Sequence, residues 1–496
     1  MTENKIQFIR GKRLADYAKE RVAVWSKRPF GRPQSSNNFL ERLTKNFFLS
    51  LEVLMGGEIY VKSSLSPWDN IPARFQRILR ELARKGVIEK IFFPQPIAGW
   101  PHIPAFSILS SNEVHASGYA LDPEIAATKA VAELIEWHTL ATPDYQRFVT
   151  GSFEKLGHNK AIDPRLFNHF SSAQLERPEY APHRIKSDST FRWVKSVSLE
   201  GNGIYLVPAQ LAHIKYDFLS EEPRIRQTIS NGGAAGISWD GAAYHALCEV
   251  IERDALMVHW LNQISPPQVE LTALRKLGHL EINALLNLYE KYAINVSLLD
   301  ITTDLRVPVF MAVIRPHAPG LPRLYLSPRC DLDKEKALVA ALTDGFRAGF
   351  LSTTTVEEIK RVEQKAPAIE NLNERRIYWC DERRDRDAEF MFLGQTEILE
   401  RNGHEGKDDA AKLKELKKIL TNYGLSAYIT DITGSLASQA GLRVVMALVA
   451  GLYPLYLNEH FKCLGSQRLH EAPIKMGIFQ RPKKEEEFNV IPHPFL

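Results

Sequence analysis

Two helical segments far apart in this chain carry the same pair of glutamates, and this repeat limits how the chain can fold. The later copy, HALCEVIER, places Glu249 and Glu252 one helical turn apart. The earlier copy, KAVAELIEW, holds Glu133 and Glu136 at the same spacing. Two such helices can bring four carboxylates to one place, where the charges repel unless a divalent cation is bound. Because oxygen ligands suit Mg²⁺, the repeat predicts a magnesium site.

A single pair of this kind has an ordinary alternative, the acidic face of an amphipathic helix exposed to solvent. The repeat extends further, since aligning the copies pairs Ala130 with Ala246 and Trp137 with Arg253, and a glycine precedes each helix. A solvated face does not explain such internal repetition. The arginine that follows the second pair can bind a phosphate or pair with a carboxylate.

A glycine-rich turn, SNGGAAG, leads into the second helix and begins with Ser230, Asn231 and Gly232. Small residues let backbone N–H groups approach an anion, and the helix that follows adds its dipole. The turn matches neither the P-loop pattern nor the dinucleotide-binding pattern. It is therefore a candidate anion site, and a tight turn without a ligand is the alternative.

Short apolar runs that read as buried strands alternate with helices, which predicts an α/β architecture with mixed sheets and packed helices. The runs are VIEKIFF, GIYLVPA, INVSLLDI and VPVFMAVI, followed later by YITDIT and LRVVMALVAGL. Helices are expected to start near Asp122, Asp240 and Asp333. At the first of these, the aspartate is the N-cap and Pro123 takes the first helical position.

The chain is expected to divide into a helical N-terminal segment at residues 1–75, a core at 76–385 and a C-terminal part at 386–496. The first segment is a possible docking region with no chemistry of its own. In the last part, DAAKLKELKKIL has the charge pattern of a solvated surface helix. The proline-spaced end, IPHPFL, is not expected to be helical.

Composition excludes several classes of protein. Hydrophobic residues make up 44% and charged residues 25%, as in ordinary soluble domains. The net charge is +4 without a dense basic tract, so nucleic-acid binding is not expected. Four widely spaced cysteines suggest neither a zinc site nor a disulfide framework, which favours a reducing, cytoplasmic location. Neither a signal peptide nor a membrane span is predicted.

At these residues the chain resembles a known family. SNGGAAG followed by HALCEVIERDA is similar to the signature of YcaO-domain proteins. The segments GLSAYITDITGSLASQAGLRVVMALVAGLYPL, LGSQRLHEAPIKMG and IPHPFL are similar to the azoline-forming, peptide-cyclodehydratase branch, and ALVAALTDGF is similar to its third helix. The resemblance covers roughly residues 75–496 and implies a YcaO-like fold.

The resemblance also implies a function. YcaO proteins use ATP and Mg²⁺ to phosphorylate a backbone amide oxygen in a ribosomally made precursor peptide. In the cyclodehydratase branch a Cys, Ser or Thr side chain then closes a thiazoline or oxazoline, as in bacteriocin biosynthesis. The metal ligands implied here are Glu133, Glu136, Glu249 and Glu252. The catalytic residues implied are Glu249, Arg253 and the C-terminal Leu496, and the nucleotide contacts are Ser230, Asn231, Gly232, Arg253, Asp344 and Lys129.

Several positions depart from the family pattern. Lys129, Trp137, Ile237, Gly241, Ala340, Asp344 and Leu496 replace Ser, Arg, Asn, Glu, Arg, Glu and Pro respectively. This leaves open a divergent enzyme, a non-catalytic scaffold that binds peptide, or an enzyme that uses another nucleophile to give a thioamide or amidine. The expected partners are the precursor peptide, an E1-like leader-binding protein and a flavin-dependent azoline dehydrogenase. The oligomeric state stays open, with a homodimer as one option.

Overall fold

The computed structural model describes residues 7–9, 71–111, 115–201, 203–316, 318–366, 368–400 and 407–496. It confirms the predicted mixture of sheets and packed helices. The helices predicted within residues 1–75 lie outside the described residues, and the division of the chain at residues 75 and 385 stays a prediction. Two compact units emerge: Met1–Leu134 with Gly278–Asn295 and Leu342–Leu351, and Ile135–Leu277 with Val296–Ala341 and Ser352–Leu496.

The first unit contains a four-stranded sheet in the order β1-β2-β3-β4. β1 pairs parallel with β2 and the other neighbours are antiparallel. The strands are β1 (Gln7–Ile9), β2 (Ile88–Phe92), β3 (Ala105–Ser110) and β4 (His115–Tyr119). The helices α3 (Ala73–Arg84) and α9 (Leu280–Lys291) belong to this unit, and β4 leads directly into α4 (Pro123–Leu140).

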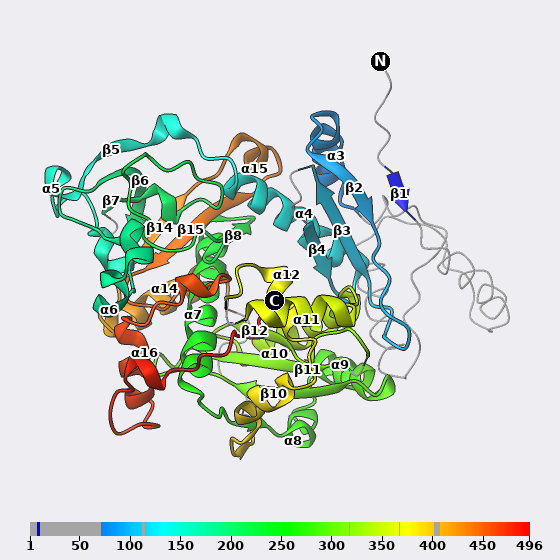
Figure 1. Cartoon of the computed structure of the whole chain (residues 1–496). Coiled ribbons are helices and arrows are strands. Elements are labelled where there is room, and N and C mark those ends of the chain that lie inside the picture. Colours follow the sequence, from blue (N-terminus) through cyan, green and yellow to red (C-terminus); the bar gives the residue numbers. More distant parts are fainter. Residues whose placement is uncertain are drawn as a thin grey trace. The chain divides into compact units, whose positions relative to one another are not determined.

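The second unit contains two sheets (Figure 1). The six-stranded sheet has the order β5-β6-β14-β15-β8, with β7 paired to β6. Its strands are β5 (Val149–Ser152), β6 (Thr190–Ser198), β7 (Ile204–Pro208), β8 (Gly233–Gly236), β14 (Ala427–Asp431) and β15 (Arg443–Val449). The five-stranded sheet has the order β12-β11-β10-β9-β13 and comprises β9 (Gln268–Val269), β10 (Asn295–Asp300), β11 (Val309–Arg315), β12 (Tyr325–Cys330) and β13 (Thr396–Glu397).

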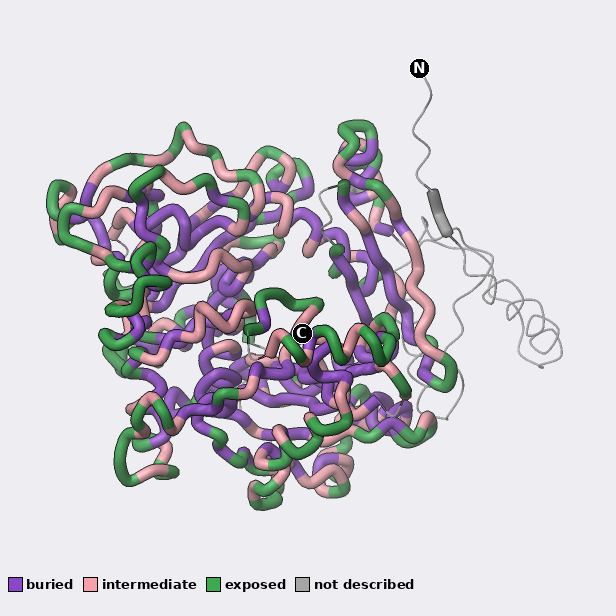
Figure 2. The backbone as a smooth tube through the Cα atoms, in the orientation of Figure 1, coloured by how far each residue is buried: buried purple, intermediate pink, exposed green. Residues whose placement is uncertain are grey.

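Helix α7 (Trp239–Asn262) is the buried centre of the second unit (Figure 2). It begins where the Ser238 hydroxyl accepts a hydrogen bond from the N–H of Gly241 at 3.0 Å, an N-cap that satisfies one free donor. It ends at Gln263, whose φ of 52° is left-handed. The helix packs against β8, β12 and β15 and against α14 (Asp409–Asn422) and α16 (Gln467–Lys475).

Local sequence signals placed the main helices and strands correctly. The helices expected near Asp122, Asp240 and Asp333 are α4, α7 and α10 (Lys334–Gly345). Asp122 caps α4 through bonds from the N–H groups of Glu124 and Ile125 at 2.7 and 3.3 Å. Each predicted apolar run contains an observed strand. The remaining α-helices are α5 (Phe153–Leu156), α6 (Ser172–Glu176), α8 (Leu271–Lys276), α11 (Val356–Lys365), α12 (Leu372–Tyr378), α13 (Arg384–Asp387) and α15 (Ser435–Gln439).

The predicted surface helix is α14, and only one of its faces is solvated. One face of α14 is buried against α7, and its buried residues include Leu413 and Leu416. Lys412 is also buried, with 2% of its surface exposed, and its ammonium pairs with Asp331 at 2.7 Å. A lysine can occupy such a position because the carboxylate compensates its charge.

The end of the chain is not helical, as predicted, and it is fixed to the second unit by buried side chains. Three consecutive backbone carbonyls, those of residues 491, 492 and 493, accept hydrogen bonds from Trp260, Trp379 and Arg375, each at 3.0 Å. Across the described part of the chain, no helix is both long and apolar enough to cross a membrane.

Candidate functional site

Helix α7 holds two carboxylates on one guanidinium. Glu249 and Glu252 lie on adjacent turns, and Arg253 donates to both, at 3.1 Å to Glu249 and 2.5 Å to Glu252. The second oxygen of Glu252 accepts from the N–H of Cys330 at 3.2 Å, and Arg329 approaches its first oxygen at 3.5 Å. Two arginines thus compensate two carboxylates at the point where α7 meets the end of β12.

Burial governs the charges of this pair. Glu252 is 4% exposed, and burial raises the pKa of its carboxyl although Arg253 and Arg329 oppose the shift. The guanidinium of Arg253 lies 4.3 Å from the ring of Phe495, in the C-terminal tail. Its Nε atom is buried without a hydrogen-bond partner. A buried, incompletely satisfied guanidinium is suited to an additional anionic ligand.

The turn before α7 holds carboxylates from two helices. The N–H of Gly232 donates to Glu249 at 3.0 Å, and the N–H of Ala235 donates to Glu136 of α4 at 3.0 Å. Between them, the N–H of Gly233 donates to the carbonyl of Ser230 at 2.7 Å. These donors therefore position carboxylates in this structure. That the N–H groups of this turn bind a phosphate or another anion stays a prediction.

The first unit repeats part of this arrangement around Glu133. Its carboxylate accepts from the N–H of Ser117 in β4 at 2.8 Å. In both copies, then, the first glutamate of the pair is held by backbone just before its own helix. Glu133 belongs to the first unit and Glu136 to the second, so the common site of all four glutamates stays a prediction.

The glycines before the two helices have the same structural role. A Cβ on Gly118 would lie 1.9 Å from the carbonyl oxygen of Ala126. A Cβ on Gly236 would lie 2.7 Å from the backbone nitrogen of Ala242. These two alanines are equivalent in the alignment of the repeat. Glycine is therefore required in each copy so that strand and helix can approach closely.

The carboxylate oxygens near α7 are of the kind that a hard cation binds, and each carboxylate is already hydrogen-bonded within the protein. Mg²⁺ takes carboxylate and water oxygens, and Glu136, Glu249 and Glu252 supply such oxygens. Among the residues that the structure describes, no three acidic, histidine or cysteine side chains form a metal-holding group. Each of these glutamates bonds instead to an N–H group or an arginine. Holding a cation would require the carboxylates to exchange some of these donors for the metal.

The predicted nucleotide contacts have varied surroundings. Lys129 donates to the carbonyl of Tyr119 at 3.2 Å, in the first unit, and Asp344 also lies in that unit. Asn231 is buried, and its side-chain oxygen accepts from the N–H of Leu455 at 3.1 Å while its Nδ2 has no partner. Leu496 is the last residue of the fixed tail and follows Phe495 directly.

Two of the departures can now be described structurally. Ile237 is 74% exposed, at the start of α7. A Cβ on Gly241 would lie 2.6 Å from a carboxylate oxygen of Asp409, from the first turn of α14. A larger residue at 241 would displace that carboxylate. Asp409 therefore places a negative charge beside position 241.

Sequence reasoning missed Arg329, Phe495 and Asp409, which come close to the predicted residues only through folding. Arg329 lies at the end of a strand 76 positions beyond Arg253 in the chain, and Asp409 lies in a charged helix assigned to solvent. No spacing rule connects them with α7. The proline-spaced tail was the one available signal, since it pointed to the neighbourhood of Phe495.

Comparison with known proteins identifies a family profile that matches residues 117–453, described as YcaO cyclodehydratase, ATP- and Mg²⁺-binding. An uncharacterized protein of Methanothermobacter thermautotrophicus is 26% identical over 268 residues, 53% of this chain and 66% of that protein. An uncharacterized protein in the tfuA 3' region of Rhizobium leguminosarum bv. trifolii is 30% identical over 138 residues, 27% of this chain and 32% of that protein. The chain thus spans less than two thirds of these relatives.

Solved structures show the same fold. A heterocyclase in complex with substrate and cofactor has a TM-score of 0.68 at 21% identity, covering 87% of this chain and 57% of its own. The heterocyclase TruD has a TM-score of 0.57 at 18% identity, covering 98% and 70%. YcaO from Methanopyrus kandleri, bound with AMPPCP and Mg²⁺, has a TM-score of 0.53 at 19% identity, covering 78% and 91%.

Proposed function

The chain belongs to the YcaO cyclodehydratase family, and from this premise we propose that it activates backbone amides of a ribosomally made peptide. The family description confirms the predicted cofactors, ATP and Mg²⁺. The product class that the resemblance implies is an azoline, formed from Cys, Ser or Thr. The observation that carries the proposal is Arg253, which lies between Glu249 and Glu252 with a buried Nε that has no partner.

The chemistry explains why such a site is needed. An amide carbon is a poor electrophile because its oxygen is a poor leaving group. Transfer of the γ-phosphoryl group of ATP to that oxygen releases ADP. A side-chain thiol or hydroxyl then loses its proton as it bonds to the carbon, the oxygen leaves as phosphate, and loss of the amide N–H proton gives the C=N bond of the azoline. Most of the catalysis lies in positioning and charge stabilisation, which suits a protein that supplies carboxylates and a guanidinium.

Arg253 is fixed for this role from three sides. Glu249 and Glu252 hold its terminal nitrogens, and the ring of Phe495 covers its face. A guanidinium held in this way loses little entropy when it binds a phosphate oxygen. Bound Mg²⁺ supplies charge neutralisation on the phosphates. The glutamates Glu136, Glu249 and Glu252 are the residues of this unit that would hold it.

A specific observation favours a second candidate, a non-catalytic subunit that binds peptide. The N–H groups of Gly232 and Ala235 are taken by carboxylates, and Ile237 projects into solvent. These features reduce the number of donors left for a triphosphate. In that case the protein would act as a scaffold in a modification complex. An enzyme that uses another nucleophile, giving a thioamide or amidine, is the third option.

The partners belong to the proposal as well. We infer a precursor peptide as substrate and an E1-like protein that binds its leader. A flavin-dependent dehydrogenase would act on an azoline product by oxidising it to the aromatic azole.

Titration of Mg·ATP by calorimetry, combined with ATP turnover, tests the proposal. Glu249→Gln keeps the side-chain shape but removes the charge that holds Arg253, so turnover with peptide and partner should be lost while the fold remains. Glu154→Gln, at an exposed helical position of the same unit, is the matched control. Unchanged turnover in Glu249→Gln would refute the metal and phosphate role. A wild-type protein that binds no Mg·ATP would favour the scaffold.

A further inference from the structure

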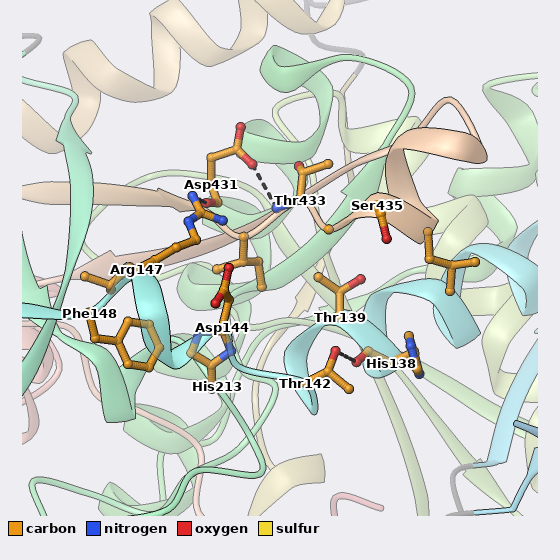
Figure 3. A pocket seen from close by; sticks show the side chains of 14 residues that line it. His138, Thr139, Thr142, Asp144, Arg147, Phe148, His213, Asp431, Thr433 and Ser435 are labelled. Carbon is orange, nitrogen blue, oxygen red and sulfur yellow. Dashed lines mark hydrogen bonds between the residues drawn. The ribbon is translucent and has the colours of Figure 1, made fainter.

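A polar cavity of about 390 Å³ lies in the second unit (Figure 3). Its walls are the C-terminal end of α4, the short helix η2 (Tyr145–Arg147) that follows, and the loop between β14 and α15. The volume is in the range of small-ligand pockets, about 300–1,000 Å³. The polar side chains of the lining include Thr139, Asp144, Arg147, Asp431, Thr433 and Ser435.

The charged side chains of this cavity make few hydrogen bonds to the protein, and Asp144 and Arg147 are exposed. Within the described part of the chain, the Asp431 carboxylate accepts one hydrogen bond, from the N–H of Thr433 at 2.9 Å (Figure 3). Asp144 accepts from the N–H of Gln146 at 3.2 Å. Among the described residues, Arg147 makes a single 3.5 Å contact with the carbonyl of Asp431 and no ion pair. The cavity therefore offers a guanidinium donor and carboxylate acceptors to a ligand.

The remaining walls are uncharged or apolar. His213 is buried, and its Nδ1 must donate to the carbonyl of Leu140, 3.3 Å away, because a carbonyl only accepts. Burial lowers the pKa of its imidazole to about 4, so the ring is neutral at pH 7. The ring of Phe148 lies 5.6 Å from it, and Ile432 adds a further apolar contact. His138 is the other histidine of the lining, beside the charged groups Asp144, Arg147 and Asp431.

This charge pattern selects among ligands. Two carboxylates against one guanidinium would repel a triphosphate. A peptide backbone, in contrast, presents N–H and C=O groups in alternation. These match a carboxylate acceptor and a guanidinium donor at the same time, and the apolar patch can accept a side chain.

The cavity is close to Glu136 through a chain of direct contacts. Glu136 is bonded to Ala235 of β8, which pairs with Val444 of β15. The backbone of Val444 bonds in turn to Ile432 at 3.0 Å and to the hydroxyl of Thr433. Two strand spacings, about 10 Å, separate Ala235 from Ile432, and the hydrogen bond from Ala235 then reaches Glu136. On α4 itself, Thr139 follows Glu136 by one helical turn.

We propose that this cavity holds a short extended segment of the substrate peptide, with Arg147 donating to a peptide carbonyl and Asp431 accepting from a peptide N–H. The peptide identity of the ligand rests on the proposed function. Arg147 and Asp431 act as binding residues that position the amide beside Glu136, and neither takes part in the chemical step. Peptide selection and nucleotide binding are thereby assigned to separate residues of one unit.

Binding of capped tripeptides to the full chain without nucleotide tests this assignment. The probes are N-acetyl-Gly-Cys-Gly-amide and its Ser and Thr analogues, at millimolar concentration, followed by ligand-detected NMR. We expect wild-type protein to bind at least one probe and Arg147→Gln to weaken that binding at least tenfold. Asp431→Asn should also weaken binding at least tenfold, because it removes the carboxylate. The fold should remain, since the asparagine oxygen can still accept from the N–H of Thr433. Arg177→Gln, an exposed arginine of the same unit, should leave binding unchanged.

Titration with Mg·ATP tests the peptide site at the cavity independently of the proposed ATP-dependent function. Arg147→Gln should leave the affinity for Mg·ATP unchanged, because the cavity is distinct from the Arg253 site. If Mg·ATP does not bind at all while the tripeptide result depends on Arg147 and Asp431, the proposed enzyme fails and the peptide site stands. Equal probe affinity in the cavity variants and wild type overturns the site. So does a parallel loss of nucleotide affinity, or no binding of any probe to wild-type protein.

Discussion

Replacing Lys412 by methionine should destabilise the second unit strongly, although the residue lies in a helix with a highly charged sequence. Only 2% of its surface is exposed, and its ammonium pairs with Asp331 at 2.7 Å and lies 5.2 Å from the ring of Tyr244. Removing one partner leaves a buried carboxylate without its countercharge, which costs about 3–5 kcal/mol. Loss of the cation–π contact adds about 0.5–1 kcal/mol.

Urea denaturation of a double-mutant cycle measures this effect. Lys412→Met should lower the free energy of unfolding by about 3.5–6 kcal/mol, and Asp331→Asn should also destabilise. The double variant has no buried charge, so it should be more stable than the sum of the single changes predicts, with a coupling of about 0.5–3 kcal/mol. Lys414→Met, on the exposed face of the same helix, should change stability by no more than about 0.5 kcal/mol. A Lys412→Met effect as small as that of the control would refute the reasoning.

Three further predictions address the repeat, the tail and the buried histidines. Gly236→Ala should lower the midpoint of thermal unfolding, because its Cβ would lie 2.7 Å from the backbone of Ala242; a folded variant with an unchanged midpoint would contradict the close approach. Phe495→Ala uncovers Arg253 and should weaken Mg·ATP binding in calorimetry without unfolding the protein, and unchanged affinity would separate the tail from the site. Burial lowers the pKa of His493 well below its usual range, and that of His259 to about 4. Each folded imidazole binds fewer protons than in the unfolded chain, so its stabilisation is present above pH 6.5 and is lost as pH falls below that value, down to about 4 for His259. The loss is about 1.4 kcal/mol per pH unit and residue, measurable by denaturation between pH 7 and 5, and a stability that rises over this range would contradict it.

Sequence alone predicted the features that depend on neighbouring residues. Capping at Asp122, the alternation of apolar runs with helices, and the glutamate spacing on α7 are local patterns, and the structure contains each of them. The similarity of the two strand–helix copies was also visible in the sequence. Its physical basis in Gly118 and Gly236 required the structure.

The features that were missed depend on residues distant in the chain. Lys412 has the sequence surroundings of an exposed residue, and only Asp331, 81 positions away, explains its burial. Arg329 reaches Glu252, and Phe495 reaches Arg253, in the same way. The cavity is lined by residues from four separate segments, two of which supply its threonines, aspartates and arginine, and none of these segments forms a motif. Spacing rules describe one helix or strand at a time, so they cannot identify such sites.

The pairing of Glu249 and Glu252 with Arg253 bears on how folding depends on metal. Because the guanidinium balances the charges of both carboxylates, α7 should fold without a bound metal ion. Chelators should therefore abolish metal-dependent activity reversibly and leave the midpoint of thermal unfolding unchanged. Small zinc domains, in contrast, unfold when the metal is removed. Adding the metal ion back would then require only that the carboxylates exchange hydrogen-bond donors for the metal within a folded protein.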